Sequence, residues 1–302
     1  MFDDSPVLII TGPTACGKTA VSEMAAIMNK GEIISADSRL FHSDLNIGTA
    51  KYTISRDIPY HMVDLVKSSE RFTVKDFLDM GRKKLSSIKD RGHLPIVTGG
   101  SMLFVERFIK GMDPSPPPNR DFRKSIREII DREGYHKAHE ILEKENPEIA
   151  RGIHPNNTKA VIRALERSIL EPPERSEGRP PLENFRSFFL TMDRDILFER
   201  IELRLEEMLE KGWIREVENL IDRGAKKDDP GLESTGYPQI LGYIQGNLSR
   251  KEMFDEILRV TRRLAIKQIK WIKRIPCEVI DMGDRLPGEV ADTIIQRVLH
   301  EE

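Results

Sequence analysis

Cysteine is scarce in this sequence, because only Cys16 and Cys277 occur among its 302 residues. Two cysteines cannot form a disulfide framework or supply the thiolates of a four-cysteine zinc site. Long apolar runs are also missing, since no window approaches the roughly 18 uninterrupted apolar residues of a membrane-spanning helix. The first residues, Met1-Phe2-Asp3-Asp4, are acidic, whereas a secretory signal begins with basic residues. We therefore expect a cytoplasmic protein with no membrane partner.

Charge of one sign is not in excess either, since the formal net charge is −2. Global charge therefore gives no indication of nucleic acid binding, and any such indication must come from local clusters. The composition, with 38% hydrophobic and 32% charged residues, is typical of a globular enzyme. A chain of this length can hold one α/β domain and a second, smaller unit.

Short apolar runs alternate with helical patterns in the first third of the sequence. Residues 7–11, 32–35 and 94–98 have the composition of buried parallel strands, and the first run ends at a glycine turn. Apolar residues at helical spacing fill much of 18–30 and 73–90. This alternation predicts an α/β fold, with a parallel sheet flanked by helices and right-handed crossovers.

Two proline-rich segments, at 113–118 and 171–181, interrupt this pattern. Dense prolines form stiff connectors that neither a helix nor a sheet tolerates. We expect residues 113–185 to be an inserted all-helical domain, and residues 1–112 and 186–302 to form the catalytic core. Helical patterns in the insert lie at about 120–133, 135–145 and 157–170. Beyond it, we expect a strand at 188–191 and helices at about 195–223, 235–245 and 250–275.

The segment between the first strand and the first helix matches the pattern G-x-x-x-x-G-K-[ST]. It reads Gly12-Pro13-Thr14-Ala15-Cys16-Gly17-Lys18-Thr19. The glycines allow successive backbone N–H groups to point at one anion, and the following helix adds its positive dipole end. Lys18 would neutralise phosphate oxygens, and the Thr19 hydroxyl would complete the coordination shell of Mg²⁺. The segment predicts a P-loop NTPase-like, nucleotide-binding core, and ATP is the usual ligand of such a loop.

Polar residues follow the second and third predicted strands. Asp37 follows the second strand, where a carboxylate would face the ligand crevice and could hold Mg²⁺ or accept a proton. An Asp-Ser pair is also a common turn or helix cap, and the spacing alone does not separate these two roles. The turn Gly99-Gly100-Ser101 follows the third strand at the same predicted edge, where glycine permits close approach to a ligand.

A stripe of one charge sign lies near the C-terminus. Seven basic residues and no acidic residue occur between Arg259 and Arg274. On a helix, Arg259, Arg263, Lys267, Lys270 and Arg274 share one face. A solvated helix face usually mixes both signs, so this basic stripe favours a nucleic acid backbone. A small-molecule kinase, the other natural interpretation of the P-loop, has no use for such a stripe.

Taken together, these segments closely resemble the tRNA dimethylallyltransferase family. The resemblance spans nearly the whole chain, and the matching segments occur in the family's order. Besides the P-loop, these segments are Ile34–Ser38, Asn46–Lys51, Ile58–Asp64, Pro95–Phe104, Ile153–Asn157, Arg163–Glu166, Gly236-Tyr237 with Gly246, Thr261–Gln268 and Trp271.

The resemblance implies a P-loop core that binds the diphosphate of dimethylallyl diphosphate, and a helical insert that binds the tRNA anticodon stem-loop. It implies a flipped-out adenosine 37 whose N6 is prenylated. By this likeness Asp37 is the general base and Ser101 orients the amine. Lys18, Thr19, Mg²⁺ and Arg204 stabilise the leaving diphosphate. The tRNA-contacting residues implied are Asp37, Ser38, Arg39, Leu40, Ser101, Arg123, Lys159, Arg163, Arg263 and Lys267.

Several positions depart from the family pattern. Cys16 and Ser101 stand where serine and threonine are usual, and Phe41 and Phe104 stand where tyrosine is common. Lys159-Ala160 replaces a Gln-Arg pair, and Ile266 replaces a basic residue. None of these changes removes a group needed for chemistry, so we expect any difference from the family in the choice of tRNA or the affinity for it. We expect a monomeric prenyltransferase, and the alternatives are a P-loop kinase and a non-catalytic RNA-binding module.

Overall fold

The computed structural model describes residues 6–55, 57–114, 116, 118–170 and 178–300, which divide between two compact units. The first unit joins Met1–Lys110 to Leu182–Glu302, and the second is Gly111–Pro181. Parts of the two proline-rich segments, including Pro117, Pro172 and Pro173, lie outside the described residues. In the parts of the chain that are described, no helix is long and apolar enough to cross a membrane.

A six-stranded parallel sheet organises the first unit, with strand order β3-β2-β4-β1-β5-β6. The strands are β1 Val7–Thr11, β2 Gly31–Ser35, β3 Tyr60–His61, β4 Leu94–Gly99, β5 Phe185–Thr191 and β6 Glu278–Asp281. The residues of β1, β2 and β4 are buried throughout, as expected for strands covered on both faces. The predicted α/β fold is therefore confirmed.

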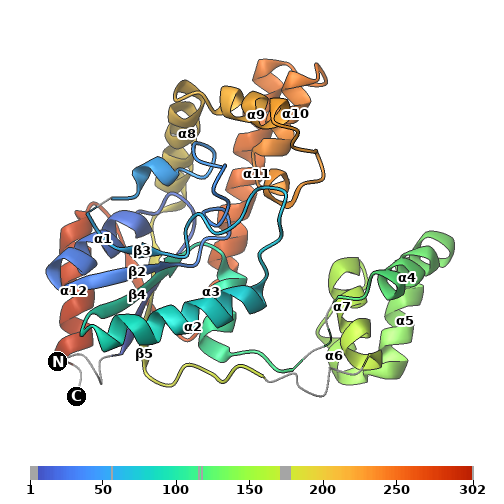
Figure 1. Cartoon of the computed structure of the whole chain (residues 1–302), viewed down its shortest axis with the longest axis horizontal. Coiled ribbons are helices and arrows are strands. Elements are labelled where there is room, and N and C mark those ends of the chain that lie inside the picture. Colours follow the sequence, from blue (N-terminus) through green and yellow to red (C-terminus); the bar gives the residue numbers. More distant parts are fainter. Residues whose placement is uncertain (1–5, 56, 115, 117, 171–177, 301–302) are drawn as a thin grey trace. The chain divides into compact units, whose positions relative to one another are not determined.

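Helices cover both faces of this sheet (Figure 1), with α1 and α12 on one face and α2 and α3 on the other. A further group of helices, α8 to α11, packs together beside the sheet. The bounds are α1 Lys18–Met28, α2 Val74–Asp90, α3 Met102–Lys110, α8 Arg194–Glu210, α9 Trp213–Asp222, α10 Tyr237–Ile244, α11 Arg250–Trp271 and α12 Pro287–His300. Three short 3₁₀ turns lie at Lys51–Thr53, Pro230–Glu233 and Ile272–Arg274.

One predicted helix is wrong in the first unit. The pattern at 195–223 suggested a single helix, whereas the structure has α8 and α9 separated at Gly212. Gly212 has φ +94°, a left-handed conformation that glycine adopts readily and that ends an α-helix. The short strands β3 and β6 and the helices α3 and α12 were not predicted.

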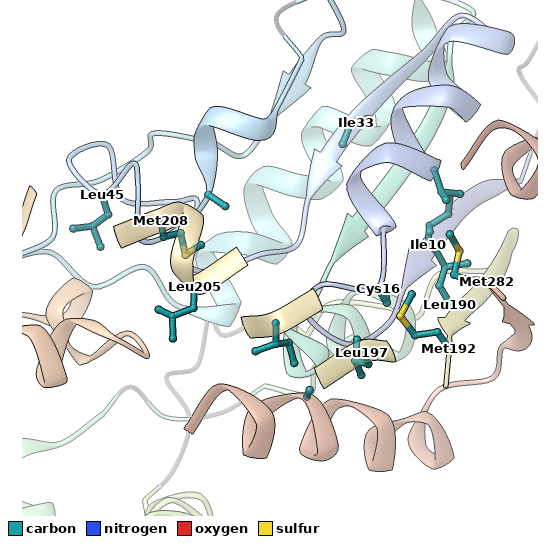
Figure 2. Packing of buried hydrophobic residues seen from close by; sticks show 14 of the residues in the cluster. Ile10, Cys16, Ile33, Leu45, Leu190, Met192, Leu197, Leu205, Met208 and Met282 are labelled. Carbon is teal, nitrogen blue, oxygen red and sulfur yellow. The ribbon is translucent and has the colours of Figure 1, made fainter. Parts of the chain in front are cut away.

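The hydrophobic core of the first unit includes a residue of the P-loop. The fully buried Cys16 side chain belongs to this core, and Figure 2 shows it close to Leu197 and Met192. Ile10 of β1 and Leu190 of β5 belong to the same cluster. The loop is therefore anchored by apolar contacts to the strand before it and to β5.

The second unit is all-helical within its described residues and has its own core. Its helices are α4 Arg120–Glu133, α5 Tyr135–Glu145, α6 Pro147–Arg151 and α7 Thr158–Ile169. The buried residues of this core include Ala138, Leu142, Val161 and Leu165. Asn119, Asn146 and Asn157 cap α4, α6 and α7 with side-chain oxygens, which explains why each helix begins where it does.

Candidate active site

The P-loop connects the end of β1 to α1, as the sequence predicted. A Cβ atom on Gly12 would lie 2.5 Å from the Leu190 carbonyl oxygen and 2.9 Å from the Cys16 sulfur, so only glycine fits there. Lys18 begins α1, and its ammonium donates a hydrogen bond to the Pro13 carbonyl oxygen at 2.6 Å. This contact holds the cationic end of Lys18 against the loop.

The ends of β2 and β4 form the opposite wall of the site. Ala36 N–H donates to the Thr98 carbonyl oxygen at 2.7 Å, and Ser101 N–H donates to the Ala36 carbonyl oxygen at 3.2 Å. The Ser101 hydroxyl oxygen accepts a hydrogen bond from Ser38 N–H at 2.9 Å and lies 2.9 Å from the Ser38 hydroxyl oxygen. These hydrogen bonds join the loop after β2 to the loop after β4, next to Asp37.

Asp37 makes a turn contact and also lies at the pocket, so its role as a proton acceptor stays a prediction. Its Oδ1 accepts a hydrogen bond from Arg39 N–H at 3.1 Å, so it does stabilise a turn. Its carboxylate also lines the central pocket of the unit. Among the described residues, no hydrogen-bond donor is found for Oδ2, which leaves that oxygen able to accept a proton.

One pocket of about 520 Å³ brings the two walls together. This volume falls within the range of roughly 300–1,000 Å³ that small-molecule sites occupy. The sequence-predicted residues that line it are Thr14, Lys18, Thr19, Asp37, Ser38, Arg39, Leu40, Ser101, Arg204 and Lys267. Arg204 reaches the pocket from α8 and Lys267 from α11. The remaining loop residues Gly12, Pro13, Ala15, Cys16 and Gly17 do not line it, so their contribution would be through the backbone.

The basic stripe is exposed as predicted. Arg259, Arg263, Lys267, Lys270 and Arg274 are all exposed, and the opposite face of α11 is buried through residues such as Ile257 and Ala265. Arg259 is paired with Glu256 at 2.5 Å, which reduces the net charge at that end. Arg263 does not line the pocket, whereas Lys267 does.

The predicted tRNA-binding arginines of the insert both contact one buried acidic side chain. Arg123 and Arg163 both contact the carboxylate of Glu166, with N–O distances of 2.7 and 2.8 Å. The side chain of Glu166 is fully buried, and its hydrogen bonds to the two arginines outweigh desolvation and lower its pKa to about 2. Lys159 is exposed at the start of α7. The two arginines therefore have a structural role, and their contact with tRNA stays a prediction.

Several pocket residues were missed because they come from irregular segments. Glu233 ends the 3₁₀ turn Pro230–Glu233, and Ser234 and Thr235 follow it. Thr49 precedes the 3₁₀ turn Lys51–Thr53, and Thr53 ends it. Their sequences carry no periodic pattern that would have identified them. Gln268 and Trp271 of α11 also line the pocket; both lie in segments that resemble the family, but neither was predicted to be a site residue.

The loop that contains Thr49 is held by an acidic side chain from α9. The Glu216 carboxylate accepts hydrogen bonds from Asn46, Ile47 and Gly48 N–H at 2.8, 2.7 and 3.2 Å. It also accepts one from the buried Tyr237 hydroxyl at 2.8 Å. Burial and this neighbouring carboxylate raise the pKa of Tyr237 well above its usual value. The loop is therefore fixed to the helical layer beside the pocket.

Comparisons with known proteins indicate the family of the chain. The family model described as IPP transferase matches residues 40–275. The tRNA dimethylallyltransferase of Halalkalibacterium halodurans is 36% identical, with 88% of each chain covered, and that of Bacillus subtilis is 34% identical, with coverage of 89% and 88%.

Solved structures give the same relationship. A full-length tRNA isopentenylpyrophosphate transferase from Bacillus halodurans superposes with a TM-score of 0.70 at 32% identity, and the match covers 98% of this chain and 97% of that one. A eukaryotic dimethylallyltransferase acting on tRNA shares the fold, with a TM-score of 0.75 at 24% identity and coverage of 92% and 74%. By sequence and by fold, this chain belongs to the IPP transferase family.

Proposed function

We propose that this protein transfers a dimethylallyl group from dimethylallyl diphosphate to N6 of adenosine 37 in tRNA and releases diphosphate. The observation that carries the proposal is a single pocket lined by P-loop Lys18 on one wall and by the Asp37 carboxylate on the other. The names of the relatives, at 33–37% identity over most of the chain, support the same reaction.

The reaction breaks the bond between C1 of the allyl group and the diphosphate oxygen, and forms a bond between C1 and N6. Positive charge develops on C1 and negative charge on the leaving group, so cations must lie at the diphosphate. Lys18 and Arg204 both line the pocket and can supply this charge, together with the N–H groups at the start of α1.

Asp37 would accept the proton that N6 loses when the new bond forms. Its Oδ1 is held by Arg39 N–H, so the carboxylate is fixed and Oδ2 can face the amine. The paired hydroxyls of Ser38 and Ser101 lie on the same wall of the pocket and would orient the adenine of tRNA by hydrogen bonding. Because N6 is a weak nucleophile, this positioning must supply much of the rate enhancement.

The residues of the pocket also fit Mg²⁺. Thr19 lies in the first turn of α1 next to Lys18, and it lines the pocket. Mg²⁺ commonly takes one or two protein oxygens together with phosphate oxygens of the substrate, so a cluster of carboxylates is not needed. Thr19 would hold the ion, and the ion would supply positive charge for the leaving diphosphate.

The tRNA would contact two regions of the chain. The exposed basic residues of α11, with Lys267 at the pocket itself, suit a phosphate backbone that leads to the reacting base. We assign the anticodon stem-loop contact of the helical unit to the exposed Lys159 and to the outer edges of Arg123 and Arg163.

The decisive experiment combines the protein with Mg²⁺, dimethylallyl diphosphate and unmodified tRNA. Nucleoside mass spectrometry should find a dimethylallyl mass on adenosine 37, and a tRNA that carries guanosine at position 37 should remain unmodified. If ATP is consumed with a small acceptor while tRNA gains no mass, the protein is a kinase. If neither reaction occurs although tRNA binds, it is an RNA-binding module.

A further inference from the structure

Gln268 joins the two walls of the pocket through its side-chain amide. The residue lies on α11, where it is only 6% exposed. Its Oε1 accepts a hydrogen bond from Thr14 N–H of the P-loop at 2.9 Å. Its Nε2 donates to the Gly100 carbonyl oxygen, in the turn after β4, at 2.7 Å. Both ends of one amide are therefore used, each by backbone of a different wall.

The surroundings of this amide explain why the chain needs glutamine there. A Cβ atom on Gly100 would lie 2.8 Å from Gln268 Nε2, so the absence of a side chain at Gly100 allows the close approach. Asparagine is shorter by one methylene and cannot span the two walls. Glutamate has the right length, but it would place an acceptor against the Gly100 carbonyl oxygen and a negative charge near Lys18.

Each wall held by Gln268 carries a residue that the proposed reaction uses. Thr14 follows Pro13, whose carbonyl oxygen accepts the hydrogen bond from Lys18. Gly100 precedes Ser101, whose hydroxyl accepts the hydrogen bond from Ser38 N–H. The same bridge therefore sets the position of the diphosphate-binding lysine and of the serine pair beside Asp37.

We propose that Gln268 is a positioning residue that fixes the P-loop relative to the Gly99–Ser101 turn. The diphosphate of the donor and the adenine of the acceptor are thereby held in the relative position that transfer requires. This role rests on the proposed function, because it assigns the two walls to donor and acceptor. It requires no contact between Gln268 and either substrate. Truncating the amide should weaken diphosphate binding and slow transfer, while RNA binding on the exposed face of α11 stays intact.

The test compares Gln268→Met, Gln268→Glu and Gln268→Asn with the wild-type full chain. Methionine keeps the volume and loses both hydrogen bonds, glutamate keeps only the acceptor, and asparagine keeps the amide but not its reach. Gln296→Ala, an exposed change on α12, is the matched control. Each protein is titrated with inorganic diphosphate in magnesium buffer, and single-turnover transfer is measured separately. Thermal unfolding shows whether each variant is folded.

Gln268→Met loses both hydrogen bonds, and we expect it to bind diphosphate roughly 5- to 100-fold more weakly than wild type. Gln268→Glu should lose at least as much, since its charge attracts Lys18, and Gln268→Asn should not restore binding. Transfer should slow by a similar factor, while the tRNA dissociation constant changes less than about twofold. Diphosphate affinity within twofold of wild type in folded Gln268→Met would overturn this role. That outcome is independent of whether wild-type protein prenylates tRNA, which alone decides the proposed function.

Discussion

Replacing Glu166 by glutamine tests how the helical unit is held together. The carboxylate is fully buried and accepts hydrogen bonds from Arg123, Arg163 and Asn119 N–H. Glutamine keeps the shape but removes the charge, and its NH₂ group would face a guanidinium that can only donate. We therefore expect the helical unit to be destabilised.

The magnitude follows from the pKa of Glu166, which is lowered from 4.5 to about 2. At about 1.36 kcal/mol for each pH unit, this shift corresponds to about 3 kcal/mol, reduced to about 2–3 because both arginines are one-third exposed. A lowered pKa means that this stabilisation is fully present above pH 4.5. It is lost as the pH falls from 4.5 towards 2.

Hydrogen exchange measured by mass spectrometry is the suitable assay, because both tryptophans, Trp213 and Trp271, lie in the other unit. Peptides from α4 and α7 should exchange roughly 30- to 150-fold faster in Glu166→Gln at pH 7. The control is Glu140→Gln, which removes an exposed partner of Lys137 in the same unit and should cost less than about 0.5 kcal/mol. Equal protection in Glu166→Gln and wild type would refute the reasoning.

Two further predictions concern the pocket loop and the basic helix. Gly48→Ala would place a Cβ atom 2.0 Å from the indole nitrogen of Trp213. We expect a loss of at least about 1 kcal/mol, seen as a lower melting temperature, and an unchanged melting temperature would contradict this packing. The double variant Arg263→Gln, Lys267→Gln should weaken tRNA binding and reduce its log–log salt slope by roughly 1.5–2. Lys83→Gln, an exposed change on α2, is the control. An unchanged salt slope in the double variant would mean that the basic residues of α11 face solvent and do not contact tRNA.

Much of the site could be predicted because parallel strands fix where loops meet. The P-loop pattern locates Lys18, and the carboxyl ends of β2 and β4 necessarily bring Asp37 and Ser101 to one edge of the sheet. Once the alternation of strands and helices is recognised, these positions require no knowledge of the rest of the chain. The same argument explains why the fold class was predicted correctly.

The rest depends on contacts that no local pattern records. Gln268 contacts Thr14, which is 254 positions away in the sequence. The segment Thr261–Gln268 resembles the family, but no local pattern indicates this contact. The strand β3 has two residues, too few for a recognisable period. The pairing of Arg163 with Glu166 was open to prediction, because a spacing of three places both on one side of a helix.

The most direct test of the central claim is single-turnover transfer by Asp37→Asn. Asparagine can still accept the hydrogen bond from Arg39 N–H, so the turn should persist while the proton acceptor is lost. The proposed mechanism predicts that transfer to adenosine 37 slows by at least about 100-fold, with the affinities for diphosphate and tRNA within about twofold of wild type. A transfer rate within tenfold of wild type would contradict the assignment of Asp37 as the base and leave it only the role of stabilising the turn.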